Sequence, residues 1–235
     1  MGLDWNPLGK PQPGREKEFY SLLGQLTVPT AWLQPSPVVH TPIPPTESQD
    51  SIRRQMFSIQ VSPYETTGAP RVGRDPAADD WIRAQYEHQP NKPASIEEWV
   101  RQFQGYYVLQ LLPPNDGLPV YSNAPMGRPW EMWSFRAQFF NDCRDVMGDA
   151  LLHEAWLHHT PDQLADYGTR LMACADVYAT ATGVSHVLQL RWFDSADSAK
   201  ADDKTSPLHK AHVIASAARW AAYWSARGHG MEADY

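Results

Sequence analysis

The sequence has little cysteine, no long apolar run and no leader segment. Its 235 residues include only two cysteines, Cys143 and Cys174, both in regions expected to be helical. A pair spaced so widely is more typical of buried thiols than of a disulfide framework. The chain opens on Met1-Gly-Leu-Asp-Trp without a basic stretch followed by an apolar one, and no apolar segment reaches bilayer length. We therefore expect a soluble, cytoplasmic protein without a membrane partner.

Basic charge and the common nucleotide-binding motifs are also lacking. The chain carries 20 lysines and arginines against 27 aspartates and glutamates, a formal net charge of −7. This balance opposes binding to a phosphate backbone, so nucleic acid is not an expected partner. There is no phosphate-binding Gly-x-x-x-x-Gly-Lys-Ser/Thr, no dinucleotide glycine fingerprint and no Gly-x-Ser-x-Gly nucleophile motif. No cofactor is predicted.

Large aromatic side chains, by contrast, are abundant. The chain has ten tryptophans and ten tyrosines, and 42% of its residues are hydrophobic. A chain of this length buries enough surface to hold a core without disulfides or metals, and most of these rings are expected there. No hinge-like stretch divides the sequence, which predicts a single globular domain over residues 1–235. A proline-rich segment at 28–45 is expected to run extended over the surface.

Apolar periodicity and capping residues predict helices and three short strands. The predicted helices cover residues 15–26, 75–86, 95–103, 135–147, 149–158, 160–183 and 206–227, and the predicted strands cover 57–61, 106–112 and 186–192. The connections between the strands contain helices and are long enough for parallel crossovers. The expected fold class is α+β, with a small mixed or parallel sheet of about three or more strands packed with several α-helices, and a mainly helical C-terminal half.

Polar loops follow each predicted strand and supply the candidate site. If the strands run parallel, these loops leave the sheet at its carboxyl edge, where open sheets usually bind ligands. Glu65 and Asp116 are the candidates for acid or base chemistry, because paired carboxylates can exchange protons with a substrate. The predicted ligand-binding residues are Tyr64, Arg71, Asn115, Tyr121 and Arg136. In the alternative interpretation, residues 115–117 form a simple turn and Glu65 pairs with a surface arginine.

Two histidines near the start of the last predicted helix are the candidate metal ligands. His209 and His212 are three residues apart and share one helical face, and the loop before them is rich in aspartate. That loop lacks the acid spacing and the central glycine of a calcium-binding hand. The sequence therefore favours a structural role for both histidines over a bound metal.

Four stretches of the sequence carry a resemblance to a known group of proteins. They are the opening Gly2-Leu-Asp-Trp-Asn-Pro-Leu-Gly-Lys-Pro-Gln-Pro-Gly14 and the stretches SPYETTGAPRVG, PPNDGLPVYSN and SFRAQF. Together they resemble an uncharacterised bacterial protein family over most of the chain. The resemblance implies a bacterial, cytoplasmic protein and implies no particular activity.

Three functional hypotheses follow from these features. The first is a non-catalytic binding protein that recognises a protein partner or a small ligand through the strand-end loops and exposed aromatic residues. The second is a small enzyme with carboxylate acid/base chemistry at the same loops. The third is a subunit of a larger assembly, with the proline-rich segment and the acidic residues 231–235 as contacts. The oligomeric state and the identity of the partner stay open.

Overall fold

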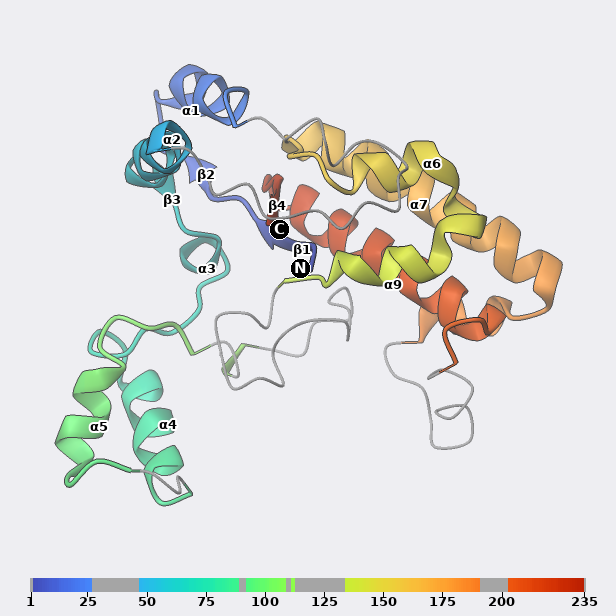
Figure 1. The fold of residues 1–235 in the computed structure, drawn as a ribbon. Coiled ribbons are helices and arrows are strands. Elements are labelled where there is room, and N and C mark those ends of the chain that lie inside the picture. Colours follow the sequence, from blue (N-terminus) through green and yellow to red (C-terminus); the bar gives the residue numbers. More distant parts are fainter. Residues whose placement is uncertain are drawn as a thin grey trace.

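Helices dominate the part of the chain that the structure describes, and short strands accompany them (Figure 1). The computed structural model describes residues 2–26, 47–88, 92–108, 111–112, 134–190 and 203–234. The elements are β1 (Asp4–Pro7), β2 (Lys10–Pro11), α1 (Glu16–Leu23), α2 (Glu47–Ser58), β3 (Gln60–Val61), α3 (Pro63–Thr66), α4 (Pro76–Tyr86), α5 (Ile96–Gln102), the 3-10 helix η5 (Ala137–Cys143), α6 (Arg144–Glu154), α7 (Pro161–Thr182), the 3-10 helix η6 (Ser185–Gln189), α9 (Pro207–Ser225) and β4 (Met231–Asp234). The predicted α+β class and the mainly helical C-terminal half are confirmed.

The longest helix, α7, begins and ends where the sequence predicts. The hydroxyl of Thr160 accepts a hydrogen bond from the backbone of Gln163, whose side chain accepts one in return from the backbone of Thr160. At the other end, Gly183 adopts φ 73°, a left-handed conformation that favours glycine. Between the ends, Gly168 packs so closely on α9 that a Cβ there would lie 2.9 Å from the Cβ of Ala221. Helices α7 and α9 therefore pack in direct contact at Gly168.

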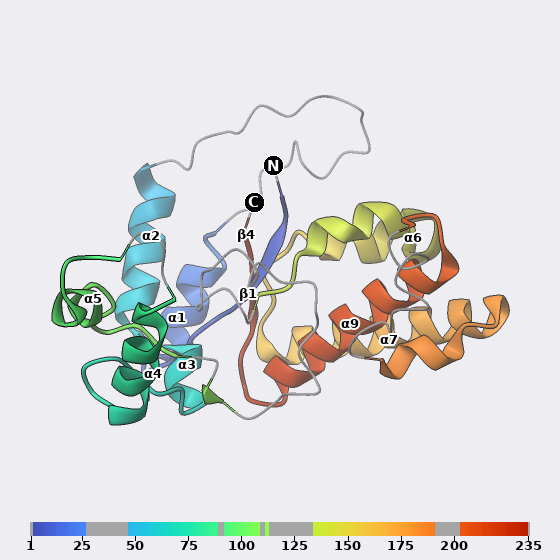
Figure 2. The same cartoon turned by 90° about the horizontal axis from the view of Figure 1, so that it is seen from below.

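The two ends of the described chain pair with each other. Strand β1 runs antiparallel to β4, with Trp5 opposite Ala233 and Asp4 opposite Asp234. Figures 1 and 2 show this two-stranded ribbon against the helical half of the molecule, with both termini beside it. Single bridges extend the ribbon on both sides, from Trp5 to Phe135 and from Met231 to His159. The chain ends are therefore built into the centre of the structure.

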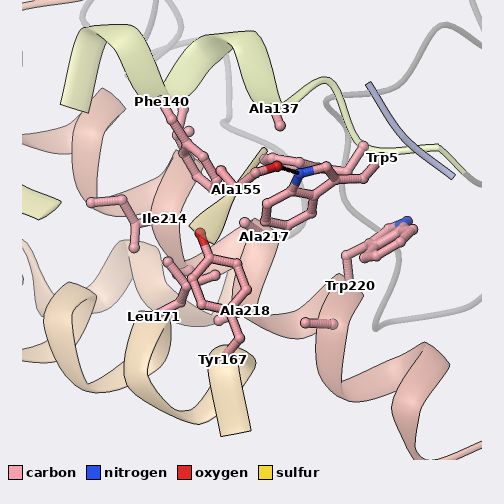
Figure 3. Packing of buried hydrophobic residues seen from close by; sticks show 14 of the residues in the cluster. Trp5, Ala137, Phe140, Ala155, Tyr167, Leu171, Ile214, Ala217, Ala218 and Trp220 are labelled. Carbon is pink, nitrogen blue, oxygen red and sulfur yellow. Dashed lines mark hydrogen bonds between the residues drawn. The ribbon is translucent and has the colours of Figure 1, made fainter. Parts of the chain in front are cut away.

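Trp5 connects this ribbon to the main hydrophobic core (Figure 3). Its side chain is fully buried, and its ring lies between 5.1 and 5.8 Å from the rings of Phe135, Phe140, Tyr167 and Trp220. The indole Nε1 donates a hydrogen bond of 2.8 Å to the main-chain oxygen of Ala155, so the one polar atom of the ring is satisfied. One side chain thus joins β1, η5, α6, α7 and α9.

Two smaller apolar clusters lie outside this core. Helices α1 and α2 bury one cluster, made of Leu8, Phe19, Leu22, Leu23, Leu26, Met56 and Ile59. Helices α4 and α5 enclose the other, around Val72, Ala78, Ile82 and Val108. In Figures 1 and 2 these two helix pairs lie on the opposite side of the β1–β4 ribbon from α6, α7 and α9. The ribbon therefore lies between the two smaller helix pairs and the helices of the main core.

The predicted strand over residues 57–61 is correct only at its end, because its first two residues belong to a helix. Helix α2 continues to Ser58, and only Gln60 and Val61 form a strand, β3, which pairs antiparallel with β2. Ile52, Met56 and Ile59 follow helical spacing and pack against α1, whereas Phe57 is 51% exposed. The alternation at 57, 59 and 61 therefore spans the end of α2 and the short strand β3.

The other two predicted strands are also wrong in the described residues. Within 106–112, only Tyr107 makes a bridge, to Arg71, and Tyr106 and Leu111 are exposed, so no central buried strand is present there. Residues 185–189 form the 3-10 helix η6, because consecutive Val187 and Leu188 both turn into the core. Both strand pairs of the described residues are antiparallel, whereas the sequence predicts a mixed or parallel sheet.

At Gly230, just before β4, the backbone closely approaches the backbone of His159. A Cβ at this position would overlap the main-chain oxygen of His159, which bonds to β4 through Met231. We expect Gly230→Ala to separate these backbones and to lower the free energy of unfolding by about 3 kcal/mol, measured by chemical denaturation.

Gly24→Ala is the matched control for that substitution. Gly24 has φ −65°, and the nearest heavy atom to an added Cβ would be 3.5 Å away. This variant should be unchanged or more stable by about 0.5 kcal/mol, since alanine restricts the unfolded chain. Equal stability of the two variants would show that the tight approach at Gly230 does not matter.

Candidate functional site

Three of the predicted site residues gather at α3 and the loop that follows it. The Glu65 carboxylate accepts a hydrogen bond of 2.7 Å from the Tyr107 hydroxyl and bonds of 3.0 and 3.1 Å from Nη1 of Arg74. Nη1 of Arg71 lies 3.8 Å from the same carboxylate. The ring of Tyr64 lies 5.4 Å from that of Tyr107. Glu65, Arg71 and Tyr64 therefore do lie close together.

This arrangement stabilises Glu65 as a carboxylate. The hydrogen bond from Tyr107, followed by that from Arg74, lowers the pKa of Glu65 below its usual value. In turn, burial and the bond to Glu65 raise the pKa of Tyr107. A carboxylate held by three partners is a poor proton donor, so the geometry favours the interpretation of Glu65 as a partner of surface arginines.

The side chain of Arg71 donates a hydrogen bond to the main chain. Its Nε donates a hydrogen bond of 2.7 Å to the oxygen of Gly105, and its backbone N–H donates one of 2.7 Å to Asp75. The guanidinium also lies over the ring of Tyr107, 5.3 Å from the ring centre. These contacts join the loop after α3 to the end of α5 and leave Arg71 with a structural role.

The remaining predicted residues do not join this cluster within the described chain. Nε of Arg136 lies 3.5 Å from Oδ1 of Asp4, so it pairs with β1 instead. Asn115, Asp116 and Tyr121 fall in 113–133, outside the described residues, so the proposed meeting of Glu65 with Asp116 stays a prediction.

The two candidate metal ligands are buried in α9. The Nε2 atom of His212 lies 2.8 Å from the main-chain oxygen of Leu190, and Nε2 of His209 lies 3.8 Å from Asp142. Burial lowers the pKa of His212 to about 4, which keeps the ring neutral. Among residues 2–26, 47–88, 92–108, 111–112, 134–190 and 203–234, no three histidine, cysteine or acidic side chains form a metal-binding group.

A cavity lies against the polar face of the β1–β4 ribbon. Its volume is about 390 Å³, in the range of small-molecule sites. The lining comes from β1, β4, the end of α2, β3 and α3, whose positions Figure 1 shows. The lining residues are Asp4, Asn6, Pro7, Leu8, Gly9, Phe57, Gln60, Ser62, Pro63, Tyr64, Ser134, Glu232 and Asp234. We call this cavity the ribbon pocket.

Acidic side chains line the strand side of the ribbon pocket. In the antiparallel register, Asp4 lies opposite Asp234 and Asn6 lies opposite Glu232, so these four side chains share one face of the ribbon. Burial raises the pKa of Glu232, Asp234 raises it further, and Arg53, 3.4 Å away, acts in the opposite direction. Like charges placed directly opposite destabilise a strand pair, and the contacts of Arg136 with Asp4 and of Arg53 with Glu232 offset part of this repulsion.

Relief of this repulsion should be measurable. Asp234→Asn keeps the shape of the side chain and removes one of the two opposed charges, so we expect the free energy of unfolding to rise by about 0.5 kcal/mol. Chemical denaturation at pH 7.5 measures the change. In Asp80→Asn the same substitution removes an exposed charge that pairs with Arg83 on α4, so this control should be unchanged or slightly less stable. A loss of stability in Asp234→Asn alone would assign Asp234 a structural role.

Gln60 of β3 also lines the pocket and carries a buried acceptor. Its Oε1 atom is buried and accepts no hydrogen bond from any described residue. An unmet buried acceptor costs about 1–3 kcal/mol. The side-chain amide lies against Gly9, where a Cβ would overlap it. The backbone between β1 and β2 and the Gln60 amide are therefore packed in direct contact.

A buried histidine holds α3 in place beside the pocket. The Nδ1 atom of His229 lies 2.7 Å from the main-chain oxygen of Leu8 and must donate to it, so Nε2 of the neutral ring is an acceptor. Nε2 lies 2.6 Å from the Thr66 hydroxyl, which is also 2.8 Å from the main-chain oxygen of Pro63. Burial lowers the pKa of His229 to about 4, consistent with this neutral form. His229 thereby positions the helix that carries Tyr64.

Sequence reasoning missed the acidic residues of the pocket. Residues 3–6 and 231–234 both alternate apolar and polar side chains, with Trp5, Met231 and Ala233 fully buried. This period of two is the signal of a half-buried strand and was readable at both ends. Residues 231–234 belong to the segment 231–235 that the sequence predicts as a contact with other subunits, and they form strand β4.

Comparisons with protein-family models, with curated proteins and with solved structures gave no match to this chain. In the described part of the chain, no helix combines the length and the apolar character needed to cross a membrane. The function must therefore be inferred from the geometry itself.

Proposed function

We propose that this protein is a non-catalytic binding protein whose small polar ligand occupies the ribbon pocket. The observation that carries the proposal is the set of carboxylates on one face of the β1–β4 ribbon, which line a cavity of about 390 Å³ despite their cost in stability. Binding sites commonly retain such unfavourable arrangements, since the ligand compensates for them. Tyr64, a residue predicted to bind ligand, contributes to the lining.

We assign this function to the cytoplasm. Cys143 and Cys174 are both free thiols, and burial raises the pKa of Cys143 to about 12, so it is not poised for disulfide exchange. Free thiols that serve as small apolar residues are compatible with a reducing compartment.

A substitution that fills the cavity tests the proposal. Asn6 lies on the polar face of β1 and lines the pocket, so Asn6→Tyr should occupy the cavity without a change of charge. Tyrosine is favoured in strands, and the fold should be retained. The wild-type protein, incubated with a metabolite extract and desalted, should show a stoichiometric mass increase in native mass spectrometry that Asn6→Tyr lacks.

The matched control is Asn141→Tyr. Asn141 is exposed on η5 and takes no part in the pocket, so this variant should retain the mass increase. The proposal fails if the wild-type protein carries no small molecule, or if Asn6→Tyr retains the same one.

A further inference from the structure

A groove lies between helices α7 and α9, which Figures 1 and 2 show side by side. Its volume is about 770 Å³, and η6 contributes to its walls together with the two helices. Small side chains make up much of the lining, among them Ala165, Thr169, Ala173, Ala218, Ala222 and Ala226. The groove and the ribbon pocket have no described lining residue in common. We call it the α7–α9 groove.

The walls of the α7–α9 groove are exposed, yet they carry few long or charged side chains. Ala165, Thr169 and Ala173 are exposed on α7, and Ala222 and Ala226 are exposed on α9. The solvent-facing side of a helix ordinarily carries charged and polar residues. Small-molecule sites bury most of the surface of their ligand, whereas these short side chains leave the groove open. A helix of another chain can approach such a surface closely, because the distance between packed helices depends on the side chains at the contact.

An exposed apolar side chain lies beside the groove on the same helix. Val177 is 71% exposed, the highest fraction among the exposed large hydrophobic residues of the described chain. It follows Asp176 and comes one helical turn after Ala173, and both of these residues line the groove. One surface therefore holds an apolar projection next to an apolar hollow. Two copies related by a two-fold axis can each insert the projection into the hollow of the other, because such an interface uses the same patch on both copies.

The charges of this surface favour a second copy over a strongly basic or strongly acidic partner. The described lining carries one acidic residue, Asp176, and one basic residue, Arg219. The Arg219 guanidinium donates hydrogen bonds to the main-chain oxygens of Leu188 and Leu190, which fix it beside η6. A patch of one charge sign would repel its own copy across a two-fold axis, whereas a patch with both signs does not. The groove is thus balanced in charge on a chain whose formal net charge is −7.

We infer that the α7–α9 groove is a dimer interface, occupied by α7 of a second copy of this chain with its Val177 side chain in the groove. The lining residues of α7 extend from Ala165 to Asp176, roughly 17 Å along the helix axis, which gives room for about three turns of a partner helix. This inference goes beyond the proposed function, because it concerns a surface that the ribbon pocket does not include.

Sedimentation equilibrium of the full chain at concentrations up to about 100 µM tests the inference. We expect a monomer–dimer equilibrium in the wild-type protein. Ala222→Glu places a long charged side chain in the groove, and Val177→Lys replaces the apolar projection with a charge, so each should raise the dimer Kd by at least about tenfold. Both positions are exposed and helical, and both new residues are good helix formers, so circular dichroism should show an unchanged fold.

Ala84→Glu is the matched control, because Ala84 is an exposed alanine near the end of α4 and lies outside the groove. Its Kd should equal that of the wild-type protein. A wild-type chain that stays monomeric at every concentration overturns the inference. A dimer whose Kd is unchanged in both groove variants, or is raised equally in Ala84→Glu, overturns it as well. The mass increase expected for the ribbon pocket should persist in Ala222→Glu, so loss of the dimer and loss of the ligand are separate results.

Discussion

Trp5→Ala is expected to remove most of the stability of the folded chain. The ring is fully buried, contacts the rings of Phe135, Phe140, Tyr167 and Trp220, and bonds to the oxygen of Ala155. Truncation of such a side chain costs about 3–5 kcal/mol, and the unpaired oxygen adds about 1 kcal/mol. Because domains of this size are stable by only about 5–15 kcal/mol, the variant should be largely unfolded at 37 °C. Circular dichroism and urea denaturation measure the effect.

Trp99→Ala is the matched control for this loss. Trp99 also donates its indole N–H to a main-chain oxygen, that of Ile82, at 2.9 Å. It is only partly buried and belongs to the small cluster between α4 and α5. Its removal should cost about half as much and should leave α7 and α9 folded. If both variants unfold at the same urea concentration, Trp5 does not have the central position described above.

Acid should destabilise the protein well before its carboxylates are protonated. Burial lowers the pKa of His158, His212 and His229 to about 4 in the folded state, whereas an unfolded histidine has its ordinary value of about 6.5. As the pH falls through 6.5, the unfolded chain takes up protons that the folded chain excludes, and this difference grows until the pH reaches about 4. The loss at pH 5 is about 2 kcal/mol for each histidine, on the order of 6 kcal/mol for the three together.

Denaturation curves at pH 7.5, 6 and 5 measure this dependence. In His212→Gln one titrating ring is replaced by an amide that can still donate to Leu190, so stability should be lower at pH 7.5 but should fall less between pH 7.5 and 5. His186→Gln changes an exposed histidine and should keep the full dependence of the wild-type protein. A flat stability between pH 7.5 and 5 in the wild-type protein would falsify the neutral state assigned to these buried rings.

Helices with local start and stop signals were predictable from the sequence. Thr160, Gln163 and Gly183 define α7 through contacts within a few residues, and Ser95 caps α5 by accepting a hydrogen bond from the backbone of Glu98. Strands failed because a few alternating residues fit two periods equally well. At 52–59 the helical pattern prevailed, since it buries Met56 and Ile59 against α1.

The site was predictable only in part, for a similar reason. Glu65, Arg71 and Tyr64 are close in sequence, so their proximity in space followed from a short loop. The acidic face of the ribbon pocket instead depends on Asp4 and Asp234 pairing from opposite ends of the chain, which no local pattern specifies. Register and partner are tertiary properties, and the sequence offers only the alternation that makes such a strand possible.

The pairing of β1 with β4 also determines when the fold can be completed during translation. Ribosomes release residue 5 long before residue 233, so during translation Trp5 has neither its strand partner nor Trp220 to pack against. Contacts between such distant segments form slowly, because the entropy of closing the loop must be met first. During translation, the Trp5 ring therefore stays without these partners until α9 and β4 have been synthesised. A transcript truncated after α9 would yield a chain with most of its helices and no ribbon pocket.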